Sequence, residues 1–91
     1  MPQVKFTRHL QRFFPDLKLV ETVPGQTVAE VVAALNARYP GLADYIIDER
    51  GALRRHVNIF IGETLIHDRR HLQDSVAEQD RVFILQALSG G

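Results

Sequence analysis

The sequence predicts an α+β fold in which one main helix packs on one face of a mixed five-stranded sheet. Three observations carry this prediction. Short strand-like segments recur along the chain, only one long segment has helical periodicity, and the last strand is apolar on both faces. A single helix cannot cover both faces of such a sheet, so one face is expected to stay open. With 91 residues and no linker-like stretch, the chain is predicted to be one domain, residues 1–91.

Two strands are expected before the helix. Residues 4–8 alternate apolar and polar side chains, which predicts a half-buried strand. The pattern is lost over residues 9–16, where Pro15-Asp16 marks a turn. Residues 17–23 are apolar and partly β-branched, so we expect a second strand that returns beside the first and ends at Pro24-Gly25.

The main helix has a recognisable start and stop. Thr27 is a candidate N-cap, and Glu30, three residues later, completes a capping-box pattern. Pro40-Gly41 ends the helix. Between these signals, apolar residues recur at helical spacing and form a stripe that must be buried: Val28, Val31, Val32, Leu35 and Tyr39.

A short helical turn and a hairpin are predicted after the main helix. Residues 42–47 can form the helical turn, and the polar residues 48–55 read as a surface loop. Strands are then expected at residues 56–61 and 64–67, joined by a tight turn at Gly62-Glu63.

The last strand is expected at residues 81–85, after an irregular segment anchored in the core by Leu72 and Val76. Because this strand is apolar on both faces, it belongs in the middle of the sheet, beside the first strand. That arrangement is the topology of the ubiquitin-like β-grasp.

The composition excludes several kinds of function. Without cysteine the chain has no disulfide, thiolate metal site or catalytic thiol. Its 11 basic and 11 acidic residues balance, so we expect no nucleic-acid partner and no attraction to anionic membranes. No apolar run approaches the ~20 residues that cross a bilayer, and no signal-peptide pattern is present. We therefore expect a cytoplasmic protein that is a monomer on its own.

An apolar patch on the open sheet face is the first candidate binding site. If the alternate residues of strand 56–61 face the helix, Phe60 faces away from it, and Phe83 and Leu85 can share that open face. We interpret Phe60, Phe83 and Leu85 as a docking patch for a partner enzyme. The alternative is that loop 48–55 or the segment around Leu72 covers these side chains as a second small core.

The remaining polar motifs give weaker signals. His67 and His71 have the spacing of a helical metal site, but two arginines lie between them and the segment reads as strand and turn, so no metal site is expected. The two basic clusters, residues 54–56 and 69–71, could steer an acidic groove of a partner. No Ser–His–acid arrangement, phosphate loop or paired-carboxylate signature is present, so intrinsic catalysis and a bound cofactor are not expected.

The carboxyl-terminal Gly90-Gly91 is the second candidate site. Because glycine lacks a Cβ, Leu88, Ser89 and the two glycines can form a tail, residues 86–91, that threads a narrow channel. The reactive group would be the Gly91 carboxylate, which becomes a good acyl donor once AMP is attached to it. The competing interpretation is a frayed and inert end, because termini are often disordered.

These features together resemble the ThiS/MoaD family of sulfur carriers. The resemblance rests on His56-Val57-Asn58-Ile59-Phe60-Ile61, on Asp80-Arg81-Val82-Phe83-Ile84-Leu85 and on Ser89-Gly90-Gly91. It is strongest toward the branch that feeds cysteine biosynthesis and toward the small subunit of molybdopterin synthase. The chain departs from many members at Gln86, where they have proline, and at Gln79-Asp80, where they have Gly-Asp.

The resemblance implies a carrier that is a co-substrate rather than an enzyme. An E1-like enzyme, using ATP and Mg, would adenylate Gly91, and sulfur would then replace AMP to give a thiocarboxylate. A sulfur-accepting synthase of the cysteine, molybdopterin or thiamine type would take the sulfur. Two alternatives stay open: a ubiquitin-like modifier conjugated through Gly91, and a non-conjugated β-grasp interaction domain.

Overall fold

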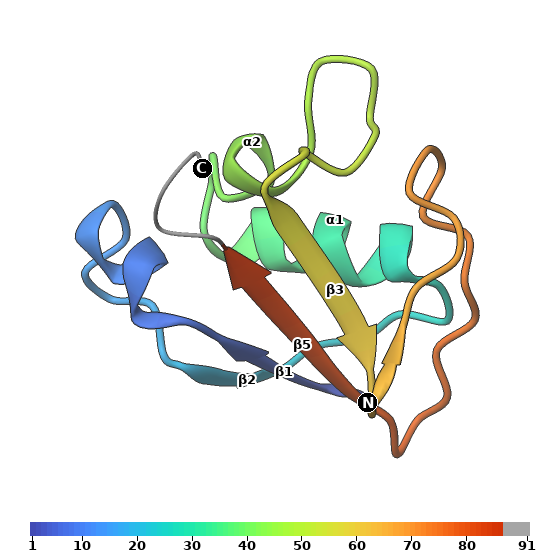
Figure 1. Cartoon of the computed structure of the whole chain (residues 1–91). Coiled ribbons are helices and arrows are strands. Elements are labelled where there is room, and N and C mark those ends of the chain that lie inside the picture. Colours follow the sequence, from blue (N-terminus) through green and yellow to red (C-terminus); the bar gives the residue numbers. More distant parts are fainter. Residues whose placement is uncertain (87–91) are drawn as a thin grey trace.

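A computed structural model describes residues 1–86 and shows one sheet with a helix across one face (Figure 1). The five strands lie in the order β2-β1-β5-β3-β4, with β5 parallel to β1 and antiparallel to β3. The predicted mixed sheet and the central place of the last strand are therefore confirmed. The strands are β1 (Gln3–Phe6), β2 (Val20–Thr22), β3 (Val57–Ile61), β4 (Thr64–Leu65) and β5 (Arg81–Gln86).

Helix α1 (Val28–Arg38) begins as the capping residues predict. The Thr27 hydroxyl oxygen accepts a hydrogen bond from the N–H of Glu30 at 3.2 Å. The Glu30 carboxylate accepts one from the N–H of Gln26 at 2.9 Å, one residue before the position used in a standard capping box. The predicted apolar stripe is buried apart from its last member, Tyr39, which is partly exposed.

The core lies between α1 and the sheet face that it covers. Alternate residues of the central strands point into this layer because successive side chains of a strand face opposite ways. Leu72 and Val76 are buried as predicted, at 2% and 5% exposure. Each of the three central strands contributes two residues that are at most 8% exposed: Val4 and Phe6 from β1, Val57 and Ile59 from β3, and Val82 and Ile84 from β5.

Several element boundaries were predicted wrongly. The first strand ends at Phe6 rather than at residue 8, and a 3₁₀ helix, η1 (Arg8–Arg12), follows it and buries Leu10. The second strand covers Val20–Thr22 rather than residues 17–23, because the N–H of Leu17 is bonded to the Phe14 carbonyl in a turn. A backbone group engaged in a turn cannot extend a strand ladder.

The later elements also differ in length from the prediction. The short helical turn is present as α2 (Ala43–Ile46). The fourth strand is Thr64–Leu65 instead of residues 64–67, since the N–H of His67 is bonded to the Asp74 carboxylate. The fifth strand continues through Gln86, so Gln86 belongs to the sheet and not to the tail.

Gly25 lies where the chain turns under the start of α1. A Cβ there would lie 2.7 Å from the Val31 Cγ2 and 2.8 Å from the Val31 backbone nitrogen, and φ is +156°. We expect Gly25→Ala to destabilise the fold by about 2 kcal/mol, because the backbone atom cannot move aside cheaply. Gly62→Ala is the matched control: φ is +64° but no atom lies within 4 Å, so it should cost only about 1 kcal/mol. Denaturant unfolding measures both values, and equal losses would contradict the clash.

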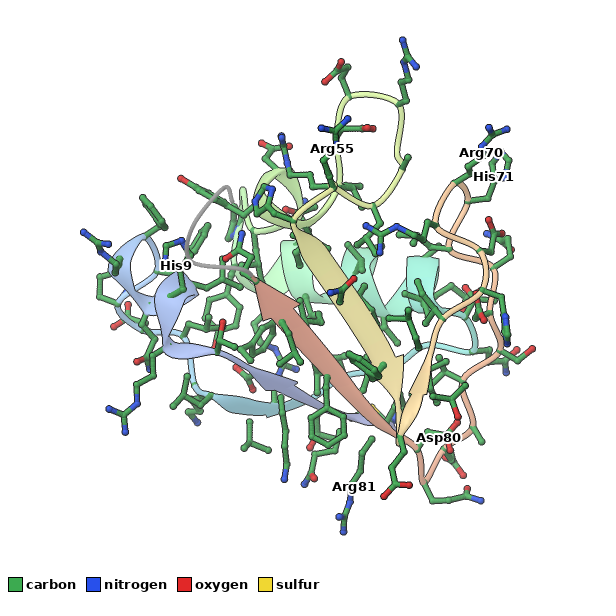
Figure 2. The ribbon with its side chains drawn as sticks, in the orientation of Figure 1. His9, Arg55, Arg70, His71, Asp80 and Arg81 are labelled. Atoms are coloured by element: carbon green, nitrogen blue, oxygen red, sulfur yellow. The ribbon has the colours of Figure 1, made fainter. Side chains whose placement is uncertain are left out.

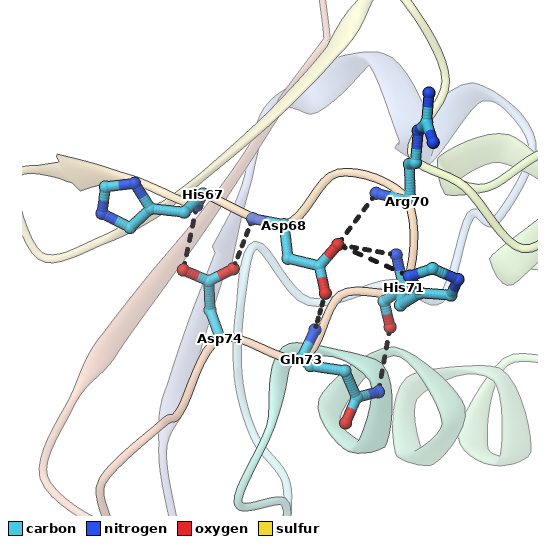
Figure 3. Close-up of polar contacts among 6 residues, drawn as sticks. All are labelled: His67, Asp68, Arg70, His71, Gln73 and Asp74. Atoms are coloured by element: carbon cyan, nitrogen blue, oxygen red, sulfur yellow. Dashed lines mark hydrogen bonds and ion pairs between the residues drawn. The ribbon is translucent and has the colours of Figure 1, made fainter.

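The loop formed by residues 67–74 is organised by two aspartates (Figure 3). The Asp74 carboxylate accepts hydrogen bonds from the N–H groups of His67 and Asp68 at 2.9 and 2.8 Å. The Asp68 carboxylate accepts three more backbone bonds, from Arg70 at 3.2 Å, His71 at 3.0 Å and Gln73 at 3.2 Å.

This loop also completes the start of α1. The first N–H groups of a helix lack partners inside it. Here the Leu72 carbonyl accepts from the N–H of Ala29 at 2.8 Å, and the Asp74 carbonyl accepts from the N–H of Val28 at 3.1 Å. Leu72 adopts a left-handed φ of 56° and is buried, so the loop holds a conformation that costs free energy in order to make these contacts.

The stability of the fold is expected to depend on acid pH through Asp68 in this loop. Backbone bonding, from His71 above all, lowers the pKa of Asp68 below its ordinary value of 3.8. A lowered folded-state pKa stabilises the fold above pH 3.8, and this contribution is lost as the pH falls through the folded value. We expect Asp68→Asn to lower the melting temperature at neutral pH and to flatten its dependence on pH below 3.8. Asp16→Asn, at an exposed turn, is the charge-matched control, and identical profiles for the two variants would contradict the prediction.

Candidate functional site

The open face of the sheet, defined as the face that α1 does not cover, carries a row of side chains across all five strands. The strand register pairs Lys5 with both Val20 and Phe83, and pairs Phe60 with both Phe83 and Leu65. Directly paired residues share a face, and the strand neighbours of the central members Lys5 and Phe83 are buried in the core: Val4, Phe6, Val82 and Ile84. We call the five paired residues the open-face row.

The open-face row is accessible to a partner. Val20 and Leu65, at its two ends, are 45% and 43% exposed, while Phe60 and Phe83 lie side by side in the middle and are partly buried. Leu85, paired with Asn58 one step nearer the end of β5, is 38% exposed. The geometry thus brings the three predicted docking residues onto one face.

Neither of the segments considered as a cover lies over this face. Leu72 is buried in the core, and its carbonyl bonds to the N–H of Ala29 in α1. Loop 48–55 is tied to α2 and to the loop at residue 69: Leu53 pairs with Ile47 and donates its N–H to the Arg69 carbonyl at 2.7 Å. The alternative of a second small core over the patch is therefore wrong.

Positive charge borders the apolar patch. The Lys5 ammonium lies 5.7 Å from the centre of the Phe83 ring, within the range of a cation–π contact. Arg81, two residues before Phe83 on β5, is exposed and lies near the start of that strand in the view of Figure 2. An apolar patch flanked by cations is suited to a partner surface with an apolar centre and acidic neighbours.

The end of β5, which we call the tail root, lies beside α2. Gln86 pairs with Val57 of β3, and its side-chain Nε2 donates to the Tyr45 carbonyl at 3.2 Å. A cavity of about 290 Å³ adjoins this point, lined by Asp44, Tyr45, Arg54, His56 and Gln86. Leu88, Ser89, Gly90 and Gly91, the residues predicted to carry the chemistry, lie outside the described residues.

The two basic clusters divide into structural and exposed members. Arg69 donates to the carbonyls of Arg54 and Val57 at 2.8 and 2.9 Å, and Arg54 donates through Nε to the Asp44 carbonyl at 2.7 Å. Arg55 and Arg70 are both exposed, and Arg70 points away from the body of the protein (Figure 2). Steering of an acidic partner thus stays a prediction for the exposed arginines alone.

The histidines do not gather into a site. His67 and His71 are both exposed on the loop of Figure 3, which is not helical. Within residues 1–86, no three His, Asp or Glu side chains are placed to hold a metal ion. No helix in that part of the chain is long and apolar enough to cross a membrane.

The sequence alone did not predict all members of the open-face row. It found Phe60, Phe83 and Leu85 by alternation within single strands, but Val20, Lys5 and Leu65 join the row only through the register between strands. Alternation in residues 4–8 did place Lys5 opposite the core, which was the available signal for that residue. No local sequence pattern predicts the hydrogen bond between the Gln86 side chain and α2.

Comparison with known sequences identifies a family for this arrangement. A family model described as the ThiS family matches residues 4–91. The sulfur carrier protein CysO of Mycobacterium tuberculosis (strain ATCC 25618 / H37Rv) is 33% identical over 69 residues, which cover 74% of this chain and 74% of CysO.

Solved structures give the same result for the fold. The crystal structure of Mycobacterium tuberculosis CysO matches with a TM-score of 0.84 at 26% identity, covering 97% of this chain and all of that one. A chain of the Amycolatopsis orientalis BexX/CysO complex matches with a TM-score of 0.82 at 23% identity, covering 100% of both chains. SAMP1 from Haloferax volcanii matches with a TM-score of 0.75 at 22% identity, covering 99% and 98%. The last two are too distant to show more than the fold, and the predicted ubiquitin-like β-grasp is confirmed.

Proposed function

The chain belongs to the ThiS family, and we propose on that premise that it carries sulfur as a thiocarboxylate on Gly91. The observation that carries the proposal is the extent of the family match, which runs from residue 4 through Gly91 and so includes the predicted tail. The likeness to the sulfur carrier protein CysO supports a carrier rather than a catalyst.

The proposed loading proceeds in two steps. A carboxylate oxygen of Gly91 attacks the α-phosphorus of ATP, and pyrophosphate leaves to give an acyl adenylate. Sulfide then attacks the acyl carbon and AMP leaves, so that one carboxylate oxygen is replaced by sulfur. Neither step needs a side chain of the carrier. The Mg ion and the electrostatic stabilisation of both transition states belong to an E1-like partner.

The proposed delivery of the sulfur also takes two steps. The thiocarboxylate sulfur attacks an electrophilic carbon of an acceptor held by a synthase of the cysteine, molybdopterin or thiamine type, and the leaving group on that carbon departs with its bonding electron pair. Water then cleaves the acyl carbon–sulfur bond, which leaves the sulfur on the acceptor and restores the Gly91 carboxylate. The likeness to CysO favours the cysteine type.

The open face is the proposed docking surface for the E1-like enzyme. Phe60 and Phe83 supply an aromatic centre, Leu85 extends it toward the tail root, and Lys5 lies at its border. Large apolar groups at the centre of an interface provide most of its binding free energy, while the surrounding contacts exclude water. A partner that holds this face has the tail root within its reach.

Exchange of labelled pyrophosphate into ATP tests the first chemical step. With an E1-like adenylating enzyme, ATP and Mg, the carrier should stimulate exchange, because acyl adenylate formation is reversible. A variant lacking Gly90 and Gly91 is the control and should give only the background of the enzyme. Stimulation by both forms equally would mean that the exchange does not report on Gly91.

Conjugation to other proteins is the second candidate function. An adenylated Gly91 can be attacked by a lysine amine as readily as by a sulfur nucleophile, and the fold is shared with SAMP1 of Haloferax volcanii. Digests of cells that express the protein would then contain lysines joined through an isopeptide bond to the carboxyl-terminal residues. Their absence under conditions where the thiocarboxylate accumulates would remove this candidate.

A further inference from the structure

The carbonyl groups of α2 are bonded in an unusual way. The last four carbonyls of a helix have no hydrogen-bond donor inside that helix. Because α2 has only four residues, all of its carbonyls need donors from outside it. Each of them nevertheless accepts a hydrogen bond. The donors are the Ile47 N–H to Ala43 at 2.8 Å, the Arg54 Nε to Asp44 at 2.7 Å, the Gln86 Nε2 to Tyr45 at 3.2 Å and the Arg54 N–H to Ile46 at 3.0 Å.

Two of these donors are side chains that link α2 to the sheet. Gln86 is the last residue of β5, and Arg54 precedes β3. The Arg54 carbonyl accepts in turn from the Arg69 guanidinium at 2.8 Å, which also reaches the Val57 carbonyl at 2.9 Å. We call Arg69, Arg54 and Gln86 the tail-root brace, because their bonds run without a break from loop 67–74 to the end of β5.

The acceptor of the Gln86 bond is itself held in place. The Tyr45 ring stacks on Phe13 with centroids 4.7 Å apart and meets Phe14 edge-on at 5.5 Å. The other side-chain atom of the amide, the Gln86 Oε1, is buried without a hydrogen-bond partner among residues 1–86. The Gln86 side chain is therefore held to α2 through its Nε2 alone, while the main chain of Gln86 pairs with Val57 of β3.

We propose that Gln86 is a positioning residue for the reaction at Gly91, an inference that rests on the proposed function. Together with the pairing to Val57, its side-chain bond to Tyr45 ties the last described residue of the sheet to α2 and so holds the point from which the tail begins. The partner then receives the following residues from one fixed origin and restricts fewer orientations when it engages them. Arg54 and Arg69 act through α2 and β3 to keep the acceptor carbonyl in place.

Adenylation kinetics test the brace directly. Gln86→Leu keeps the size of the side chain and removes the donor, so kcat should fall about fivefold, the factor that corresponds to one hydrogen bond. KM should not change, because the open face still docks. Arg54→Met should lower kcat in the same direction, and it should have little further effect when Gln86 is already leucine, since Arg54 acts through the same acceptor. Gln79→Leu, at an exposed position outside the brace, is the control and should behave as wild type.

Hydrogen exchange supplies a readout that needs no partner. In Gln86→Leu the Ile47 N–H, which closes α2, should exchange faster while the amides of the core strands keep their rates. An unchanged Ile47 rate, or a kcat equal to that of wild type, would overturn the brace and leave sulfur carriage intact. A wild-type carrier that is never adenylated would overturn the proposed function instead, and the exchange result would still decide whether Gln86 holds α2.

Discussion

Removal of Gly90 and Gly91 is expected to abolish sulfur loading completely while the melting temperature stays within a degree or so of wild type. The Gly91 carboxylate is the proposed reacting group, and no residue of the folded body replaces it. Among the described residues 1–86, the buried hydrophobic core runs from Val4 to Ile84. Thermal unfolding and a loading assay on the same preparation measure both quantities, and short terminal segments generally contribute little to stability.

A variant with one alanine added after Gly91 is the matched control. It keeps both glycines and the composition of the tail but displaces the carboxylate by one residue. We expect it to load poorly as well, because the reacting atom no longer reaches the nucleotide. If cells that express only the truncated protein keep its full cellular function, the protein is instead an interaction domain whose terminus is inert.

Replacement of both central aromatic residues, Phe60→Ser with Phe83→Ser, is expected to weaken binding to the activating enzyme by about 100-fold or more. Two paired aromatic side chains at the centre of a docking face are the kind of group whose truncation costs ~2 kcal/mol or more each in binding. Because Phe60 and Phe83 are only partly buried, their replacement should lower the free energy of unfolding by about 2 to 3 kcal/mol in total, less than the stability of a typical domain, so the variant should stay folded. Calorimetric titration measures the affinity, and denaturant unfolding checks the fold.

Leu65→Ser serves as the control at the edge of the same row. Leu65 is 43% exposed at the end of the row, where contacts contribute less than at the centre. We expect a loss of affinity below about tenfold, in line with a peripheral contact. If the double replacement binds as tightly as Leu65→Ser, the enzyme docks elsewhere on the carrier.

The parts of the fold that could be predicted have local causes. The start of α1 follows from Thr27 and Glu30, which lie close in sequence and satisfy backbone groups beside them. The central place of β5 follows from its having apolar residues on both faces. Phe60 and Phe83 were placed on the open face by the alternation of single strands, and the register then brought them into direct pairing.

The parts that could not be predicted depend on contacts between distant segments. The fourth strand is short because the Asp74 carboxylate takes the N–H of His67, and no local pattern announces that bond. The sequence predicted a steering role for Arg69 and Arg54 within the two basic clusters, whereas the fold places main-chain carbonyls beside their side chains. Gln86 was assigned to the tail because glutamine carries no strand signal, whereas its pairing with Val57 keeps it in the sheet.

The absence of cysteine makes the central claim unusually simple to test. The only sulfur atom that the sequence encodes is in Met1, so transferred sulfur has no side-chain thiol on which to reside. The decisive measurement is the mass of the intact carrier after incubation with ATP, Mg, its E1-like enzyme and sulfide, followed by fragmentation. The account predicts that one oxygen is exchanged for sulfur, that the change maps to Gly91, and that it requires ATP. An unchanged mass under conditions where the enzyme is active, or a sulfur atom mapped to any other residue, would contradict it.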